Sequence, residues 1–212
     1  MIRMSAGATL VCFAVKDETK FFRAANCRTL ITGMGQKNAA ENLQKELAST
    51  KPALVLTCGF AGGLNPELKA GDVVFDADAN SRRKEELIAL GAIPANFHCA
   101  ERVAITVAEK KALRKSFNAD AVEMESAAIR AICREKNIPS ATVRVISDDA
   151  SEDLPLDFNE LMTPDYRLSM AKLLGRLMRE PSKIPQLLEF QKKTVFAARR
   201  LGELLEKLVV DG

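Results

Sequence analysis

The chain has 212 residues, 47% of them hydrophobic and 28% charged, and it carries a formal net charge of +3. This composition excludes an intrinsically disordered chain, a collagen-like repeat and a disulfide-stapled miniprotein, and the length fits one domain with its own hydrophobic core. The charge is uneven, because the segment from Arg167 onward holds ten basic and five acidic residues. The remaining body is close to neutral and has no tryptophan and one tyrosine, which argues against a nucleic-acid-binding protein.

Cysteine and histidine are too sparse and too scattered for a zinc site or a disulfide framework. The five cysteines form no CxxC pair, and His98 is the single histidine. We therefore expect reduced thiols, no metal and a cytoplasmic location. No run of 18 apolar residues predicts a membrane-spanning helix. The cysteines are Cys12, Cys27, Cys58, Cys99 and Cys133.

Short apolar runs alternate with amphipathic segments along the chain, which is typical of an α/β fold. In chain order, the expected elements are strands at Thr9–Val15 and Arg28–Thr32, a helix at Lys37–Ser49, strands at Ala53–Cys58 and Val73–Phe75, helices at Arg82–Leu90, Glu109–Phe117 (with Thr106 as N-cap) and Glu125–Lys136, a strand at Ala141–Ile146 and a long helix at Leu187–Val209. We expect a three-layer αβα sandwich with a mainly parallel or mixed central sheet. Residues 1–212 would form a single domain that ends in an amphipathic helix at about 187–209.

Polar or glycine-rich stretches follow three of the expected strands. Asp17 and Glu18 come after the first strand, Gly59–Gly63 after the third, and Ser147-Asp148 after the late strand. Ligands of such sheets bind at the carboxyl ends of the strands. We therefore expect these three stretches to surround one crevice, with the glycine run as a turn that approaches a ligand.

A further glycine turn, Gly33-Met34-Gly35, stands between an expected strand and a helix. Such a turn can hold a phosphate on its backbone N–H groups, or it can simply pack the helix closely on the strand. A dinucleotide site would also need an acidic residue at the end of the next strand. Ala53–Cys58 has none, which argues against an NAD-binding protein.

Two acidic motifs are candidates for catalysis or for simple helix capping. Glu123 and Glu125 stand two positions apart and cannot share one helix face, so we expect one to point into the site and the other away. Asp148 follows Ser147 at the end of a buried strand, where a neighbouring hydroxyl can orient a carboxyl group as a general acid.

Three stretches together resemble the nucleoside phosphorylase/nucleosidase superfamily: Ala61–Val74, Val122–Ile129 and Val143–Asp148. The similarity runs in order from about Val11 to Asp149. Within this superfamily, the chain resembles the methylthioadenosine/S-adenosylhomocysteine nucleosidases and, more distantly, purine and uridine phosphorylases. Phe60 and the run from Ser147 to Asn159 are most similar to the hopanoid-associated phosphorylases, which implies adenosylhopane as a substrate.

The resemblance implies a role for several residues. Asp148 would protonate the leaving purine at N7 while Ser147 holds its carboxyl group. Glu125 would accept hydrogen bonds from the ribose hydroxyls, and Met124 would pack on the sugar. Arg144 would lie near the nucleophile, and either Asp17 or Glu18 would orient a water molecule. The further substrate-binding candidates are Glu123, Phe60, Ala61, Gly62, Gly33 and Gly35.

The chain departs from the nucleosidase pattern at several places. Phe60 replaces a serine, and Ala104 stands near the position of the aromatic residue that stacks on the purine. The segment between Asp76 and Glu101 is shorter, which predicts a wider pocket at the 5′ end of the sugar. Arginines that could capture phosphate are Arg23, Arg82 and Arg144.

We therefore expect an enzyme that cleaves the N-glycosidic bond of a purine nucleoside, with adenine as the base and a 5′-substituted ribose, by phosphorolysis or by hydrolysis. The alternatives are a methylthioadenosine/S-adenosylhomocysteine-type nucleosidase and a nucleoside-binding protein that has lost catalysis. No cofactor is needed, although inorganic phosphate is the co-substrate of a phosphorylase. The resemblance also implies a homo-oligomer.

The C-terminal helix has a basic and an apolar side. We expect the apolar side to pack on the domain or on a partner subunit. The alternative is contact with an anionic membrane surface, which would place the protein at the inner membrane. The basic residues are Lys192, Lys193, Arg199 and Arg200, and the apolar ones are Leu188, Val195, Leu201, Leu204, Leu205 and Leu208.

Overall fold

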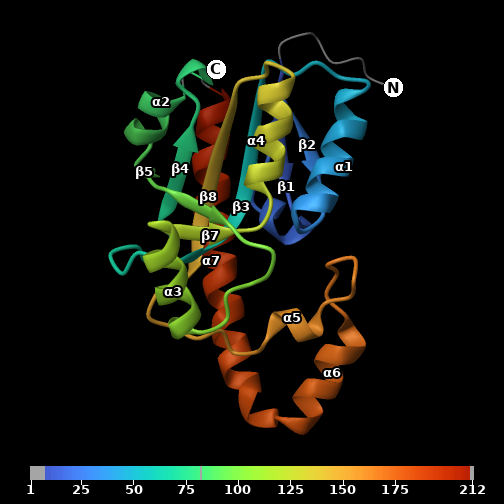
Figure 1. Ribbon diagram of the computed structural model, residues 1–212, viewed down its shortest axis with the longest axis vertical. Coiled ribbons are helices and arrows are strands. Elements are labelled where there is room, and N and C mark those ends of the chain that lie inside the picture. The colour runs from blue at the N-terminus through green and yellow to red at the C-terminus, as the bar shows by residue number, and fades with distance from the viewer. Residues whose placement is uncertain (1–7, 82, 211–212) are drawn as a thin grey trace.

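A computed structural model describes residues 8–81 and 83–210, and it has one mixed sheet covered by helices (Figure 1). The strands are β1 (Thr9–Phe13), β2 (Cys27–Ile31), β3 (Leu54–Gly63), β4 (Val73–Ala77), β5 (Ile93–Pro94), β6 (Phe97–Cys99), β7 (Ala121–Glu123) and β8 (Ser140–Asp148). The α-helices are α1 (Gln36–Leu47), α2 (Lys84–Ala89), α3 (Val107–Phe117), α4 (Ser126–Glu135), α5 (Phe158–Leu161), α6 (Met170–Arg179) and α7 (Ile184–Val210). Short 3-10 helices are η1 (Lys16–Thr19), η2 (Ala79–Ser81) and η3 (Pro181–Lys183).

The sheet has the order β2-β1-β3-β8-β4-β5, and β7 joins it by pairing with β3 and β6. The central strands β2, β1, β3 and β8 are parallel, whereas β4 runs antiparallel to β8 and β7 antiparallel to β3. The carboxyl ends of β1, β3 and β8 therefore lie at the same edge. The expected mixed α/β sheet is confirmed.

The two faces of the sheet bury different helices. Residues Leu10 and Cys12 of β1 pack with α1 and α4, while Val11 and Phe13 pack with α2 and α7. This alternation follows from the two-residue period of a strand, which sends successive side chains to opposite faces. The helices thus form two outer layers around the sheet (Figure 1).

Most expected elements occur within a few residues of their predicted bounds, but one expectation about the site is wrong. The glycine run Gly59–Gly63 is not a turn after the third strand, because β3 continues through it to Gly63. The neighbouring strand β8 also extends further, to Asp148, and pairs with β3 over this stretch. A local irregularity between Ala61 and Gly62 shifts the register there. Thr106 is confirmed as the N-cap of α3, since its side chain accepts a hydrogen bond from the Glu109 N–H.

The C-terminal part of the chain divides into two regions. The second half of α7 lies on the sheet, and its residues Leu201, Leu204, Leu205 and Leu208 are buried. Their packing on the domain accounts for most of the apolar side of the basic helix, whereas Leu188 is exposed. The segment with α5, α6 and the first half of α7 projects beyond the carboxyl edge of the sheet (Figure 1). Within residues 8–81 and 83–210, no helix is long and apolar enough to cross a membrane.

Candidate active site

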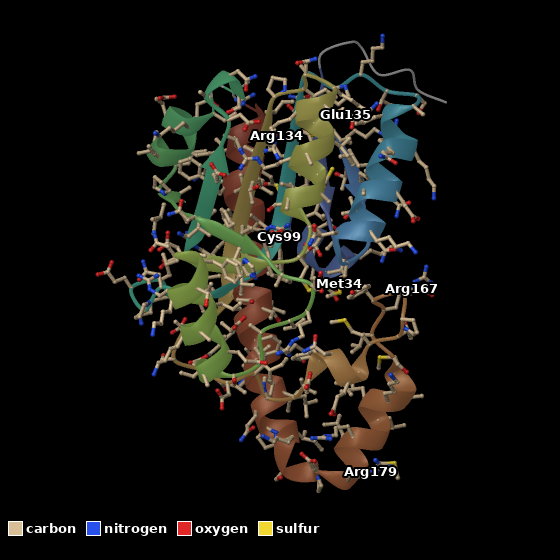
Figure 2. All side chains as sticks on the ribbon, in the orientation of Figure 1. Met34, Cys99, Arg134, Glu135, Arg167 and Arg179 are labelled. Atoms are coloured by element: carbon tan, nitrogen blue, oxygen red, sulfur yellow. The ribbon has the colours of Figure 1, made fainter. Side chains whose placement is uncertain are left out.

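A cavity of about 450 Å³ opens at the carboxyl ends of β1, β3 and β8, between the sheet and the projecting segment. Its volume lies in the range of small-molecule binding sites, roughly 300–1,000 Å³. The sheet side contributes Ala14, Val15, Asp17, Glu18, Met34, Phe60–Gly62, Val122–Glu125, Ser147 and Asp148. The other side includes Leu154, Phe158, Met162, Leu168, Phe190 and Val195. Figure 2 shows Met34 at the edge of the sheet, facing the projecting segment.

Glu18 is the acidic residue that the first strand end places inside the protein. Its side chain is buried, and its two carboxyl oxygens accept hydrogen bonds from the backbone N–H groups of Ala14, Val15 and Phe60 at 2.8–3.0 Å. Asp17 is exposed, although it also borders the cavity. Burial raises the pKa of Glu18, and Arg144 together with the three backbone donors offsets this only in part.

Gly59 leaves the space that the Glu18 carboxyl group occupies. A Cβ atom at position 59 would lie 2.3 Å from Glu18 Oε1 and 2.6 Å from an Arg144 guanidinium nitrogen, both far below contact distance. Its φ of +147° is also one that side-chain-bearing residues rarely adopt. The glycine in β3 therefore lets the Glu18 carboxyl group, from η1, and the Arg144 guanidinium group, from β8, both approach this strand.

Arg144 gathers two more carboxyl groups. Its guanidinium nitrogen lies 2.6 Å from Glu123 and 3.2 Å from Glu125, and all three side chains are buried. Further hydrogen bonds reach Thr57 Oγ1 and the Cys58 carbonyl. The backbone N–H of Gly35 donates to Glu125 Oε1 at 2.8 Å, which ties the β2–α1 turn to the site. We call Glu18, Glu123, Glu125 and Arg144 the charged floor.

The carboxyl groups of the charged floor are electrostatically unequal. Burial alone would raise the pKa of Glu123, but Arg144 and hydrogen bonds from the Glu125 and Ser126 backbones and the Ser126 hydroxyl lower it overall. Burial raises the pKa of Glu125 to about 7; Arg144 opposes this rise, and the charges of Glu123 and Glu18 add to it. Burial would lower the pKa of Arg144, but the surrounding carboxylates raise it. One guanidinium thus serves three carboxyl groups, and Glu123 is its ionised partner.

Asp148, at the end of β8, is held from two sides. The Ser147 hydroxyl donates to Asp148 Oδ1 at 2.6 Å, and the Lys110 ammonium lies 2.6 Å from Oδ2. Gly62 on β3 packs directly beside this carboxyl group, since a Cβ atom there would stand in van der Waals contact, 3.4 Å from Oδ2. A held carboxyl group and the three glutamates of the charged floor therefore line one cavity, and Arg144 acts on it through these glutamates.

Comparisons with known proteins agree with this arrangement. The family model described as "Phosphorylase superfamily" matches residues 96–179. A 5'-methylthioadenosine/S-adenosylhomocysteine nucleosidase from Glaesserella parasuis serovar 5 (strain SH0165) is 30% identical over 167 residues, which are 63% of this chain and 72% of that protein. The chain belongs to the nucleoside phosphorylase/nucleosidase superfamily.

Solved structures show the same fold as this superfamily member. The native futalosine hydrolase of Helicobacter pylori strain 26695 has a TM-score of 0.67 at 16% identity, with 98% of this chain and 99% of that chain covered. A putative 5'-methylthioadenosine/S-adenosylhomocysteine nucleosidase from Borrelia burgdorferi B31, bound to adenine, has a TM-score of 0.70 at 14% identity, with coverages of 96% and 100%.

One geometric expectation for this superfamily member is wrong. Glu123 and Glu125 do not point in opposite directions, because both reach Arg144. The helix-face argument fails since Glu123 ends the strand β7 and Glu125 is the N-cap of α4, so the two lie on different elements. Gly33 and Gly35 do not line the cavity. Gly35 instead contacts a lining residue, because its backbone N–H donates a hydrogen bond to Glu125.

The three arginine candidates for phosphate capture lie in different parts of the structure. Neither Arg144 nor Arg23 lines the cavity: Arg144 pairs with Glu123 and Glu125, and Arg23 donates to the backbone carbonyls of Thr19 and Phe22. Arg82 lies outside the described residues. Lys20 and Arg102 border the cavity instead. Among the described residues, no group of three or more His, Cys, Asp or Glu side chains could hold a metal ion.

Sequence reasoning missed two parts of the site. The first is Lys110, which is fully buried. Its spacing of three residues from Leu113 puts both on the same face of α3, and this spacing was the one sequence feature that could have indicated a buried lysine. The other part is a set of apolar side chains from the projecting segment and its neighbours. Ala104 also lines the cavity, so no aromatic ring stands there. We call Phe158, Met162, Leu168 and Phe190 the apolar wall.

Proposed function

We propose that this protein hydrolyses the N-glycosidic bond of an adenine nucleoside that carries an apolar 5′ substituent. The observation that carries the proposal is that one cavity is lined both by the glutamates of the charged floor and by an Asp148 carboxyl group held by Ser147. Cleavage of this bond places positive charge on the ribose and negative charge on the base. The glutamates of the charged floor would stabilise the positive charge on the ribose, and Asp148 would neutralise the negative charge on the base.

The proposed roles follow from position and charge. Asp148 donates a proton to N7 of the leaving purine, and Ser147 fixes the orientation of its carboxyl group. Glu125 accepts hydrogen bonds from the ribose hydroxyls, with Met124 packed against the sugar. Glu18 orients and deprotonates the attacking water, and its burial favours this base role over that of the exposed Asp17.

Charge balance favours water over phosphate as the nucleophile. A phosphate dianion beside Glu18 and Glu125 would add negative charge where three carboxyl groups already share one guanidinium. The Nη1 and Nη2 groups of Arg144 donate to Glu123, Glu125, Thr57 and Cys58. Its Nε has no partner among the described residues, but Arg144 does not line the cavity in which an anion would bind. Burying a charge without a partner is costly. Hydrolysis also agrees with the nucleosidase relatives.

The apolar wall supports the 5′-substituted substrate. Phe158 and Phe190 contact each other with ring centroids 5.6 Å apart, and Met162 and Leu168 continue the same surface. Such a surface favours an alkyl or thioether group over a charged one. Methylthioadenosine is the first candidate, because the curated relative is named for it. Adenosylhopane, with its far larger apolar group, is the second.

Base release with and without phosphate tests the proposal. We would incubate the protein with methylthioadenosine, S-adenosylhomocysteine, adenosine, inosine and a 5′-alkyl adenosine, and separate the products. We expect free adenine and free sugar, independent of phosphate, from the 5′-substituted adenine nucleosides. Ribose 1-phosphate formed only with phosphate would show a phosphorylase. Release from the 5′-alkyl compound alone would favour the adenosylhopane-type substrate.

The Asp148→Asn variant checks the acid role, and ligand binding checks for lost catalysis. We expect base release by Asp148→Asn to fall by about 10²–10⁴-fold, as for loss of a general acid. Undiminished release would rule out that role. If methylthioadenosine raises the unfolding temperature of the wild-type protein but no base is released, the chain is a nucleoside-binding protein.

A further inference from the structure

The proposed reaction gives no role to Lys110, a buried lysine that lies next to Asp148. It lies on α3 with 0% of its side chain exposed and does not itself line the cavity. Its Nζ lies 2.6 Å from Asp148 Oδ2. Burying an ammonium ion is costly unless it is paired and hydrogen-bonded. Lys110 therefore acts on the cavity only through Asp148.

The other contacts of Lys110 hold it in place. Its Nζ donates to the backbone carbonyls of Asp149, at 2.7 Å, and Glu152, at 2.8 Å. An ammonium group has three N–H donors. Two of them reach these carbonyls, and the contact of Nζ with Asp148 Oδ2 is an ion pair rather than a hydrogen bond. A neutral amine has two, and the two carbonyls match these. The two carbonyls therefore hold the Lys110 nitrogen beside Asp148 both as an ammonium ion and as a neutral amine.

We propose that Lys110 is a positioning residue for Asp148 and the source of the proton that Asp148 passes to the purine. This inference rests on the proposed function. The two groups lie 2.6 Å apart and both are buried, so a proton held by Lys110 can move to the carboxyl group when Asp148 gives its own proton to the purine.

The proton transfer balances without another reactant. The N9–C1′ bond breaks, and its electron pair goes to the purine. The N7–H bond forms with a proton from Asp148, and an N–H bond of Lys110 breaks as its proton moves to the carboxyl group. Asp148 ends as a carboxylate and Lys110 as a neutral amine, which takes up a proton from water before the next turnover.

The other charged groups around the pair have partners of their own. From the loop after β8, Glu152 pairs with Lys193 of α7, and Asp149 accepts the N–H of Ala70. At the start of α3, Glu109 pairs with Arg102, and Asp153 accepts the N–H of Val107. These groups are the same in the wild-type protein and in a Lys110 variant. Their effect on the pH profile therefore cancels when the variant rate is divided by the wild-type rate at each pH.

The test is the pH profile of adenine release by Lys110→Met, with methylthioadenosine as substrate. We expect the rate to fall about 100-fold or more at about pH 8, the size of a lost general-acid contribution, and to approach the wild-type rate at about pH 5. The alkaline limb of the profile thus moves to lower pH. Lys111→Met, an exposed lysine on the same helix, is the matched control and should leave the profile unchanged.

A uniform loss of rate at every pH would overturn the inference, because a merely structural lysine affects all pH values alike. Lys110→Gln keeps a hydrogen-bond donor without a transferable proton, and it should behave as Lys110→Met does. If neither variant folds, the wild-type profile decides: a rate already lost between about pH 5 and pH 7 excludes a lysine-held proton. Absence of adenine release by the wild-type protein would instead be a failure of the proposed function.

Discussion

The glutamates of the charged floor and the apolar wall line the same cavity but are held in different ways. Every member of the charged floor is buried, and its glutamates accept hydrogen bonds from Phe60 of β3, from Arg144 of β8 and from the backbones of Ala14, Val15 and Gly35. The apolar wall comes from α5, the α5–α6 connection and the exposed half of α7, and α6 itself has no buried residue. Its side chains contact each other by packing, as Phe158 and Phe190 do, and a single β-bridge joins the backbones of Met162 and Leu168.

This difference suggests a division of labour. Groups that must carry charge or move protons need fixed partners and a low dielectric, which the sheet provides. Groups that select an apolar substituent need only shape and apolar surface, which a projecting segment can vary without disturbing the sheet. Substitutions in the charged floor should therefore change the chemical step, and those in the apolar wall should change substrate selection.

The largest effect is expected at Glu18. In Glu18→Gln the base that orients the water is lost while the size of the side chain is kept, so kcat should fall about 10²–10⁴-fold, with KM little changed. Asp17→Asn is the matched control, because Asp17 is exposed next to it. Steady-state kinetics of adenine release measures both. Equal losses in the two variants would contradict the assignment of the water-orienting acid to Glu18.

Removal of Arg144 should affect folding as well as activity. Arg144→Met leaves Glu123 and Glu125 buried without their cation, and breaking a buried ion pair in this way costs about 3–5 kcal/mol. Chemical denaturation measures the free energy of unfolding. Arg134→Met is the control, since Arg134 is exposed on α4 at the end away from the cavity (Figure 2). A similar, small change in both variants would show that the charged floor does not stabilise the fold.

The raised pKa of Glu125 predicts a pH dependence of stability. A carboxyl group with a pKa near 7 in the folded state and near 4.5 in the unfolded state binds its proton more tightly when folded. Its contribution to stability is therefore complete below about pH 4.5 and is lost as the pH rises through about 7. The loss is roughly 3 kcal/mol at most.

Glu125→Gln should remove this part of the pH dependence. We would measure the free energy of unfolding between about pH 4.5 and pH 8 for the wild-type protein, for Glu125→Gln and for Glu67→Gln, an exposed control. The wild-type and control curves should fall with pH more steeply than that of Glu125→Gln. Identical slopes in all three proteins would show that Glu125 keeps its ordinary titration.

The sequence predicted the sheet well because its central strands are continuous apolar runs, and it placed Asp148 and the acidic pair after β1 at the correct edge. It could not predict β5, β6 and β7, which have two or three residues each and no periodicity. The glycine run was misassigned because its pairing with β8 is a long-range contact. Lys110 was missed because only tertiary packing shows that its charge is buried against Asp148.

The smallest effect is expected in the apolar wall. Phe158→Ala removes the ring contact with Phe190 and apolar surface beside the proposed 5′ group. An aromatic contact contributes about 0.5–1.5 kcal/mol, so KM for methylthioadenosine should rise up to about tenfold, while kcat changes little. Adenosine, which lacks the apolar substituent, should be affected less. Phe117→Ala, at an exposed ring outside the cavity, is the control. If Phe158→Ala weakens adenosine and methylthioadenosine equally, the apolar wall supports the cavity as a whole and does not recognise the 5′ substituent.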